Sequence, residues 1–422
     1  MESNEAVVIT GSQRLEGKVI VNGAKNAALP ILAASMLSED RITLNNVPIV
    51  SDILTLKRAM ERIGVSIQLH NNNAYINART INDTVVPLED LCKLRASILI
   101  AGPLLARKKE AIIAQPGGCA IGSRPIDLHL SGFEKLGAKV ERLNKDYLRL
   151  TVDELKGSKI YLPLPSVGAT ENIMMASCLA EGRTVIANAA QEPEIVDLAN
   201  FLLAMNARIV GAGTSTIVID GVKRLSAANH SIIPDRIEAG SFMIASAITK
   251  GCVEVCRVNP AHINCLIGIL KRAGITVETS KDNNSILVTG TKNCSSLNVV
   301  TEGYPGFPTD FQPLITTLLS LAKGNSVVTD TVFPERFCYM PALNTMGARI
   351  EVRGNSAFIS GVDKLHGAKV SATDLRAGFA LMLAGIAAEG QTTVNNLHYV
   401  KRGYQDIIAR LEKLGAVITT IN

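Results

Sequence analysis

One short phrase recurs six times along the chain and constrains its fold more than any other feature. Each copy is a short amphipathic helix that ends in Gly-Ala or a similar pair and runs into a strand, as in EKLGAKVERL and NTMGARIEV. Successive copies lie about seventy residues apart. The turn positions of the copies are Gly64, Gly137, Asn206, Gly274, Gly347 and Gly415. Glycine and asparagine both tolerate the left-handed conformation at the end of a helix, so we expect a helix C-terminus at each position.

A second phrase alternates with the first. It is an apolar helix opened by Asn, Ser or Asp, often closed by Gly and followed by a β-branched strand, as in SVGATENIMMASCLAEG-RTVIANAA. Further copies cover residues 26–37, 234–251, 308–324 and 372–390. The opening residues are typical N-caps, and the glycines suit the position after a helix. These helices are apolar nearly all round, which predicts that they are buried, whereas the amphipathic helices lie outside.

Six β-α-β-α-β-β units account for a chain of 422 residues. A chain of this length exceeds what one hydrophobic core supports, so we expect an α/β protein of two domains with three units each. In each domain the apolar helices lie inside and the sheets outside. Repeats of this kind also form open solenoids, but the units are long and none reads as a capping repeat, which favours closed domains.

Composition excludes several classes of protein. Hydrophobic residues make up 47% of the chain and charged residues 19%, as in packed globular proteins. The net charge of +5 is spread without a dense basic run or interleaved aromatic residues, so we expect no nucleic-acid partner. The first ten residues lack the apolar core of a secretory signal, and the longest uncharged apolar run, near 377–388, is too short to span a bilayer. We therefore expect a cytoplasmic protein without a membrane partner.

The cysteine and histidine patterns favour no metal site. Eight cysteines include no CxxC pair, and six histidines form no cluster, so most cysteines read as small buried hydrophobic residues. Cys119 differs, because it lies in the polar segment QPGGCAIGSRPIDLH, after two glycines and five residues before Arg124. Cations stabilise a thiolate, so Cys119 is a candidate nucleophile or proton donor. The alternative is one more buried structural thiol.

The other candidates stand mainly where the apolar helices begin. The N-terminus of a helix suits an anion because its N–H groups are unpaired, and arginines recognise phosphates and carboxylates. On this ground we list Lys25, Asn26, Ser166, Val167, Asp310, Asp374 and Arg376, with Arg95 and Arg402 as further basic candidates. Each of them also has a plain structural reading, as a helix cap or as an arginine that extends along an apolar surface to water.

Nine motifs in order along the chain carry a resemblance to a known family. They are VNGAKNAALP (21–30), LRASILIAGPL (94–104), PGGCAIGSRPIDLH (116–129), SVGAT (166–170), EPEIVDLANFL (192–202), PDRIE (234–238), FPTDFQ (307–312), ATDLRAG (372–378) and RGY (402–404). On these motifs the chain resembles, over essentially its full length, the UDP-N-acetylglucosamine enolpyruvyl transferases of the EPSP synthase-like superfamily. The resemblance implies two inside-out α/β barrels with the active site in the cleft between them. One barrel would hold residues 22–232, including the Cys119 loop, and the other would hold 1–21 and 233–422.

The resemblance also implies an activity. Members of the family transfer the enolpyruvyl group of phosphoenolpyruvate to the 3′-hydroxyl of UDP-N-acetylglucosamine and release phosphate, which begins peptidoglycan precursor synthesis. The expected partners are these two small molecules, and no metal or organic cofactor is required. The resemblance says nothing about the oligomeric state.

Residue roles follow from the resemblance position by position. Cys119 matches the proton donor that fosfomycin alkylates, and Asp310 matches the residue proposed to take the hydroxyl proton. Lys25, Arg124 and Arg402 match cations around phosphoenolpyruvate. Asp374, a further catalytic candidate, and Arg376 match residues near the reacting centre, and Arg95 matches another basic residue of the site. The remaining matches are contacts to the UDP-sugar: Asn26 and Val332 at the sugar; Pro125, Ile126, Asp127, Leu128 and His129 at the uridine; and Ser166 and Val167 at the diphosphate. Leu164 departs from the family pattern, which sometimes has Lys there near the nucleotide.

Two other functions fit the same residues less well. The shikimate-pathway enolpyruvyl transferase shares the fold but lacks this cysteine loop. A catalytically silent relative that binds UDP-sugars as a regulator would be free to lose catalytic residues, whereas Lys25, Cys119, Arg124, Asp310, Asp374 and Arg402 are all present.

Overall fold

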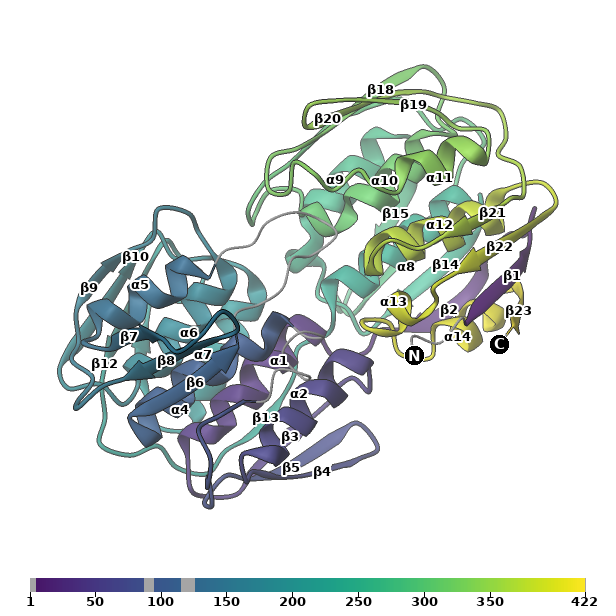
Figure 1. The fold of residues 1–422 in the computed structure, drawn as a ribbon. Helices are drawn as coiled ribbons and strands as arrows, with labels where there is room; N and C mark the ends of the chain where they lie inside the picture. The colour runs from purple at the N-terminus through teal and green to yellow at the C-terminus, as the bar shows by residue number, and fades with distance from the viewer. Residues whose placement is uncertain (1–4, 87–94, 115–125, 422) are drawn as a thin grey trace. The chain divides into compact units, whose positions relative to one another are not determined.

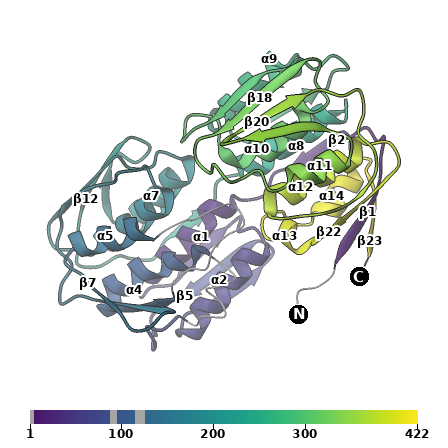
Figure 2. The same cartoon turned by 45° about the horizontal axis from the view of Figure 1, so that its top comes forward.

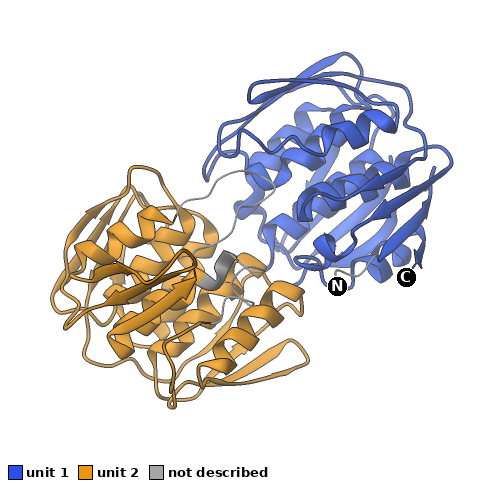
Figure 3. Ribbon diagram, in the orientation of Figure 1, with its two compact units in different colours: residues 1–22, 119–123, 234–422 blue, residues 23–118, 124–233 orange. Residues whose placement is uncertain are grey.

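The computed structural model describes residues 5–86, 95–114 and 126–421, and for residues 95–97 it describes the backbone alone. The described chain divides into two compact units (Figure 3). Unit 1 holds residues 5–22 and 234–421, and unit 2 holds the described residues between 23 and 233. The chain passes from one unit to the other after Asn22 and returns after Ile233.

Unit 2 contains three separate sheets with a common strand order. In the two four-stranded sheets the first pair of strands is parallel and the other pairs are antiparallel. The third sheet has three strands, and Val85 forms a parallel bridge to its Ile112. In order of hydrogen bonding the strands are β13 (Asn229–Ser231), β3 (Ile42–Asn45), β5 (Asn73–Asn77) and β4 (Ser66–His70); β9 (Lys159–Tyr161), β10 (Arg183–Ala187), β12 (Thr216–Asp220) and β11 (Arg208–Val210); and β6 (Glu110–Ala114), β8 (Tyr147–Thr151) and β7 (Lys139–Arg142).

Unit 1 contains three four-stranded sheets with the same order and the same pattern of one parallel and two antiparallel pairs. The strands are β2 (Glu16–Ile20), β14 (Cys252–Cys256), β16 (Ser285–Thr289) and β15 (Thr276–Thr279); β17 (Asn298–Thr301), β18 (Asn325–Asp330), β20 (Ser356–Ser360) and β19 (Arg349–Arg353); and β21 (Lys369–Ser371), β22 (Gln391–Asn395), β1 (Ala6–Thr10) and β23 (Val417–Ile421). Strand β1 therefore takes the third place in its sheet, which β16 and β20 take in theirs. The beginning of the chain completes the last repeat.

Central helices fill the interior of each unit (Figures 1 and 2). In unit 2 they are α1 (Lys25–Ala34), η2 (Arg95–Ile100) continued by α4 (Ala101–Lys108), and α6 (Val167–Ser177). In unit 1 they are α8 (Arg236–Ile248), η4 (Thr309–Phe311) continued by α10 (Gln312–Leu319), and α12 (Leu375–Ala387), which pack against one another. Every residue of α8 and α10 is buried. The prediction of buried apolar helices is confirmed.

Along the chain, each of the remaining helices comes after a central helix and before the last strands of the same repeat. They are η1 (Ser35–Leu37), α2 (Ser51–Arg62), α5 (Asp127–Lys135), α7 (Pro193–Ala204), η3 (Pro260–Ile263), α9 (Asn264–Arg272), α11 (Met340–Thr345), α13 (His398–Lys401) and α14 (Ile407–Lys413). Helix α9 buries Leu266, Ile267 and Leu270 and exposes Arg272, as an amphipathic outer helix does.

All six predicted turn positions have positive φ. The angles are 99° at Gly64 and Gly137, 72° at Asn206, 83° at Gly274, 94° at Gly347 and 104° at Gly415. The predicted α/β fold of repeated units with inner helices and outer sheets is confirmed. Among the described strands no sheet closes on itself, so each unit is three sheets wrapped around helices, without a continuous hydrogen-bonded barrel.

A second repeated contact was not predicted from the sequence. The glycine after the third strand of four sheets donates its N–H to a glycine carbonyl near the end of the preceding central helix. The N–H to O distances are 2.8 Å from Gly11 to Gly390, 3.0 Å from Gly221 to Gly182, 2.9 Å from Gly290 to Gly251 and 3.0 Å from Gly361 to Gly324. A Cβ at Gly361 would lie 1.7 Å from the carbonyl oxygen of Ala322, so the strand and the helix end are in direct backbone contact.

We predict that Gly361→Ala destabilises unit 1 by about 1–3 kcal/mol, because the added methyl group forces the backbone apart. Gly268→Ala is the matched control, since a Cβ at Gly268 in α9 meets no atom within 4 Å. Alanine in a helix interior should be neutral or stabilising there. Urea denaturation of both variants would measure the difference, and equal stability would contradict the close contact seen at Gly361.

Candidate active site

Seven of the described candidate residues lie at the N-terminal ends of the central helices: Lys25, Asn26, Ser166, Val167, Asp310, Asp374 and Arg376. Lys25 is the first residue of α1, and Asp310 lies in η4 directly before α10. Ser166 caps α6, and its hydroxyl oxygen accepts a hydrogen bond from the Ala169 N–H at 3.4 Å. Asp374 caps α12 by accepting from the N–H groups of Arg376 at 2.8 Å and Ala377 at 3.1 Å. Ser166 and Asp374 therefore act as helix caps, which is the structural role predicted for them as an alternative to a role in the site.

In unit 1 these ends meet in a group of charges that we call the Asp310 cluster, made of Asp310, Arg336 and Arg376. The Oδ1 atom of Asp310 lies 3.0 Å from Nε of Arg376 and 3.2 Å from Nη2 of Arg336. The two arginine side chains are almost fully buried, whereas the Asp310 side chain is 30% exposed. A carboxylate that reaches solvent beside two fixed cations is suited to an anionic substrate and to proton transfer.

Arg376 also brings the third central helix to this cluster. Burial opposes the charge on Arg376, but neighbouring Tyr404, Asp310 and Asp235 outweigh it and raise the pKa of the guanidinium above its ordinary value. Asp235 is the N-cap of α8, so the N-terminal ends of α8, α10 and α12 lie close to one guanidinium. The guanidinium of Arg376 lies 5.3 Å from the ring centre of Tyr404, whose hydroxyl is 2.7 Å from the Ser241 hydroxyl.

A buried carboxylate, Asp330 at the end of β18, stabilises the Asp310 cluster through hydrogen bonds. Its Oδ2 accepts from the Thr309 hydroxyl at 2.7 Å, and that hydroxyl accepts from Nη1 of Arg336 at 3.0 Å. Its Oδ1 accepts from the Thr301 hydroxyl at 2.8 Å and from the Val332 N–H at 3.0 Å. Asp330 thereby ties the start of η4 to the loop that carries both Val332, a predicted sugar contact, and Arg336.

In unit 2 the structure brings together residues of two predicted motifs. His129, in the first turn of α5, is buried, and its ring lies against the first turn of α6. A Cβ added to Gly168 would come within 3.1 Å of the His129 Cε1 atom. The segments Asp127–His129 and Ser166–Gly168, which are about forty residues apart, are therefore neighbours in space.

Lys25 forms a buried ion pair that the sequence did not predict. Its Nζ lies 3.0 Å from Oδ2 of Asp52 in the first turn of α2, and both side chains are at most 10% exposed. The lysine is thus held at the first turn of α1 by a neighbouring helix. Asn26 follows it in the same turn and is half-buried.

Some predicted residues cannot be placed in this geometry. Cys119, Arg124 and Pro125 lie outside the described residues, and so does the side chain of Arg95. Of those that are described, Ile126 is buried, Leu128 and Val167 are half-buried, Asp127 is exposed, and Arg402 is half-buried at the end of α13. Val332 is 39% exposed and Leu164 is 67% exposed.

The structure adds functional candidates that sequence reasoning missed: Asp52, Asn172, Asp330, Arg336 and Tyr404. Of these, Arg336 had the clearest signal, because it follows the Phe333-Pro334 pair by two residues and the predicted sugar contact Val332 by four. Tyr404 belongs to the RGY motif and follows α13, whereas Asp52, Asn172 and Asp330 are single polar residues in helices or at a strand end, and nothing in their local pattern marks them.

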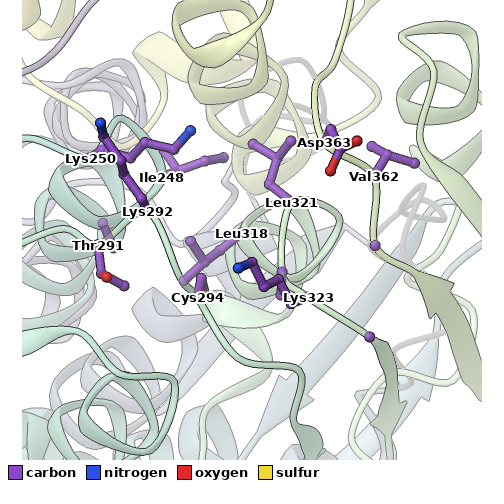
Figure 4. Close-up of a pocket in the computed structure, with 14 residues that line it drawn as sticks. Ile248, Lys250, Thr291, Lys292, Cys294, Leu318, Leu321, Lys323, Val362 and Asp363 are labelled. Carbon is purple, nitrogen blue, oxygen red and sulfur yellow. The ribbon is translucent and has the colours of Figure 1, made fainter.

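A surface cavity of about 410 Å³ lies elsewhere in unit 1 (Figure 4). It is lined by residues at the C-terminal ends of α8 and α10, including Ile248, Lys250, Leu318 and Lys323. No predicted site residue that the structure describes lines it. The candidate site and this cavity are therefore at opposite ends of the same helices.

The described residues hold no group of three or more His, Cys, Asp or Glu side chains placed to bind a metal ion. Within that same part of the chain, no helix is long and apolar enough to cross a bilayer.

Comparison with known proteins assigns the class. The family model for EPSP synthase (3-phosphoshikimate 1-carboxyvinyltransferase) matches residues 9–411. Among solved structures, the enolpyruvyl transferase NikO from Streptomyces tendae aligns with a TM-score of 0.90 and 22% identity over 99% of both chains. EPSP synthase from Acinetobacter baumannii aligns with a TM-score of 0.77 and 20% identity over both full chains. The fold is therefore that of the EPSP synthase-like enolpyruvyl transferases.

Curated relatives narrow the assignment within this class. The UDP-N-acetylglucosamine 1-carboxyvinyltransferase 2 of Carboxydothermus hydrogenoformans is 50% identical over 99% of this chain and 100% of its own. The UDP-N-acetylglucosamine 1-carboxyvinyltransferase of Finegoldia magna is 48% identical over 99% of both chains. The chain belongs to the UDP-N-acetylglucosamine 1-carboxyvinyltransferase family, and the resemblance inferred from its motifs is confirmed.

We predict that Asp330→Asn destabilises unit 1 by about 1–3 kcal/mol, because an amide cannot accept from all four donors that surround the carboxylate, which are the hydroxyls of Thr301 and Thr309 and the N–H groups of Val332 and Phe333. Asp363→Asn, at an exposed position of the same unit, should change stability by less than about 0.5 kcal/mol. Urea denaturation followed by circular dichroism would measure both variants. An Asp330→Asn variant as stable as the wild type would contradict the conclusion that Asp330 stabilises the Asp310 cluster.

Glu171 in α6 generates a pH prediction. Burial, with Glu194 and Glu192 nearby, raises the pKa of this carboxyl well above its ordinary value. The folded state therefore holds a proton that the unfolded state has lost, and stability falls as pH rises from the ordinary pKa of a glutamate through the raised one.

Glu171→Gln should remove this loss of stability at high pH. The urea midpoint of the variant should therefore exceed that of the wild type, and the difference should be larger at pH 8 than at pH 5. Glu134→Gln, exposed on α5, should keep the wild-type pH dependence. A pH dependence left unchanged by Glu171→Gln would show that this carboxyl does not titrate as described.

Proposed function

We propose that this protein transfers the enolpyruvyl group of phosphoenolpyruvate to the 3′-hydroxyl of UDP-N-acetylglucosamine and releases phosphate. The observation that carries the proposal is 48–50% identity, over nearly the whole chain, to relatives named for this activity. The reaction would be the first committed step of peptidoglycan precursor synthesis. Phosphoenolpyruvate is a cytoplasmic metabolite, so the reaction would take place in the cytoplasm.

The proposed mechanism is an addition followed by an elimination. Cys119 donates a proton to the methylene carbon of phosphoenolpyruvate while the 3′-hydroxyl oxygen bonds to the adjacent carbon and Asp310 takes the hydroxyl proton. Loss of phosphate and of one methyl proton from the tetrahedral adduct then restores the double bond. An acid and a base on opposite sides of the double bond each lower the barrier of the addition.

Cations stabilise the charge that develops in this reaction. Lys25, Arg124 and Arg402 would bind the phosphate and carboxylate of phosphoenolpyruvate, where fixed charges are effective because they need no rearrangement. Arg376, with Arg336 beside it, would hold the Asp310 carboxylate in place. The two contacts that Asp310 makes at 3.0 and 3.2 Å support this role.

The remaining predicted residues would bind UDP-N-acetylglucosamine. Asn26 and Val332 are assigned to the sugar, Ser166 and Val167 to the diphosphate, and the segment from Pro125 to His129 to the uridine. The proximity of His129 to the first turn of α6 supports the last two assignments, since a diphosphate joins the sugar to the uridine. Arg95 and Asp374 are assigned to the surroundings of the reacting centre.

The first test is phosphate release from phosphoenolpyruvate with and without UDP-N-acetylglucosamine. The wild type should release phosphate only when both are present. Cys119→Ala and Asp310→Asn should each lower kcat by about 10²- to 10⁴-fold, the usual contribution of a general acid or base. A wild type that binds the UDP-sugar but releases no phosphate would contradict the proposal and favour a silent binding protein.

The identity of the reactive thiol has a separate test by fosfomycin labelling. Burial raises the pKa of Cys178 to about 12 and that of Cys294 to about 11, so these thiols stay protonated and inaccessible. Cys338 is exposed and is the matched control. Cys119→Ser should abolish labelling, whereas Cys338→Ser should retain one equivalent. Retained labelling in Cys119→Ser would assign the reactive thiol elsewhere.

A further inference from the structure

Tyr404, which follows α13, lies against the face of α12 that carries Arg376. Its ring centre is 4.5 Å from that of Phe379, with the two rings stacked, and 5.3 Å from the guanidinium carbon of Arg376. Arg376 and Phe379 are three residues apart, so they lie on the same face of α12. Gly403 permits this approach, because a Cβ there would lie 2.6 Å from Cδ2 of Leu375. The ring of Tyr404 is therefore part of the surface against which the arginine packs.

The hydroxyl of Tyr404 is anchored in another central helix, α8. It lies 2.7 Å from the Ser241 hydroxyl, and Ser241 donates to the Ile237 carbonyl oxygen at 2.7 Å. Tyr404 and Ser241 are both buried, with at most 1% of either residue exposed. A serine hydroxyl has one proton and a carbonyl only accepts, so the Ser241 proton is directed to Ile237. Tyr404 must therefore be the donor to Ser241.

The direction of this hydrogen bond orients the dipole of the phenol. The proton of Tyr404 points to Ser241, so the lone pairs of its oxygen are left for another partner. Burial raises the pKa of Tyr404 above its ordinary value, although the charge of Arg376 opposes this rise. The hydroxyl therefore stays protonated at neutral pH and acts as a fixed dipole, without a role as acid or base. A fixed dipole beside a buried cation stabilises it without rearrangement.

Arg376 in turn contacts the Asp310 carboxylate. Its Nε lies 3.0 Å from Oδ1 of Asp310, and only 5% of the arginine side chain is exposed. An arginine that is free to rotate loses conformational entropy when it is fixed, so neighbours that hold it in advance strengthen its contact with Asp310. A phenylalanine in place of Tyr404 would fill the same space. The hydroxyl is the feature that packing alone does not require.

We propose that Tyr404, anchored by Ser241, is a positioning residue that holds the guanidinium of Arg376 against the Asp310 carboxylate. The effect of Tyr404 on the reaction rests on the proposed function, in which Asp310 takes the hydroxyl proton. The contacts among Ser241, Tyr404 and Arg376 belong to the protein alone, so the positioning is also tested without substrates.

The kinetic test uses three variants of the full chain: Tyr404→Phe, Ser241→Ala and the two combined. Tyr404→Phe removes the hydroxyl and keeps the ring, whereas Ser241→Ala keeps the hydroxyl and removes its anchor. Each should lower kcat for phosphate release about tenfold, the effect of one lost hydrogen bond, and change the KM of either substrate by less than about twofold. The combined variant should also lose about tenfold, because the two groups act as a unit.

Ser246→Ala is the matched control. Ser246 is a second buried serine of α8, and it donates to the Val288 carbonyl oxygen at 2.7 Å. Its loss should lower the urea midpoint about as much as Ser241→Ala does and leave kcat unchanged. A wild-type kcat in Tyr404→Phe or Ser241→Ala, or a loss of about a hundredfold in the combined variant, would overturn the proposal. If Tyr404→Phe fails to fold, Ser241→Ala tests the same hydrogen bond from its other side.

The positioning itself is measured by NMR of the ¹⁵N-labelled protein without substrates. The signal followed is the Nε–H of Arg376, which is identified by its loss in Arg376→Lys. Tyr404→Phe and Ser241→Ala should each raise the exchange rate of this proton with water about tenfold, and Ser246→Ala should not. Unchanged exchange in both variants would overturn the proposal. A wild type that shows the expected exchange but releases no phosphate would count against the proposed function and leave the positioning intact.

Discussion

Burial of the central helices is the constraint on which the rest of the structure depends. In α8 and α10 every residue is buried, so polar chemistry cannot be placed along the sides of these helices without an internal partner. Only the ends remain, and the N-terminal end supplies unpaired N–H groups and partial positive charge. Asp235, Asp374 and Ser166 satisfy some of these groups as caps. The same ends carry the candidate catalytic and binding residues.

The two units use this arrangement in different ways. In unit 1 the helix ends are charged, and Asp310 is held by two buried guanidinium groups. A buried charge is tolerated because it is paired and hydrogen-bonded, and the network around Asp330 provides these bonds. In unit 2 the amide of Asn172 lies between the imidazole of His129 and two backbone groups.

The repeats and the helix starts were predictable from the sequence, because both follow from local rules. The left-handed turn at Asn206 and the cap at Asp374 each depend on a few adjacent residues. Partners from distant parts of the chain were not predictable. Asn172 meets His129 across 43 residues, and Asp310 meets Arg376 across 66. Such contacts leave no period or spacing in the sequence, since they depend on how helices pack. The glycine contacts after the third strands were missed for the same reason.

The position of β1 has a consequence for how the protein is made. The described residues of unit 2 all lie between residues 23 and 233, so a ribosome has delivered all of them once residue 233 has emerged. Unit 1 is interrupted by that stretch, and β1 pairs with β22 and β23 at the far end of the chain. Strand β1 is therefore made before unit 2 but is among the last strands to find its neighbours. Until β22 and β23 have been made, a nascent chain carries unit 2 and an apolar segment, AVVIT, with nothing to pair with, which is the kind of segment that chaperones bind.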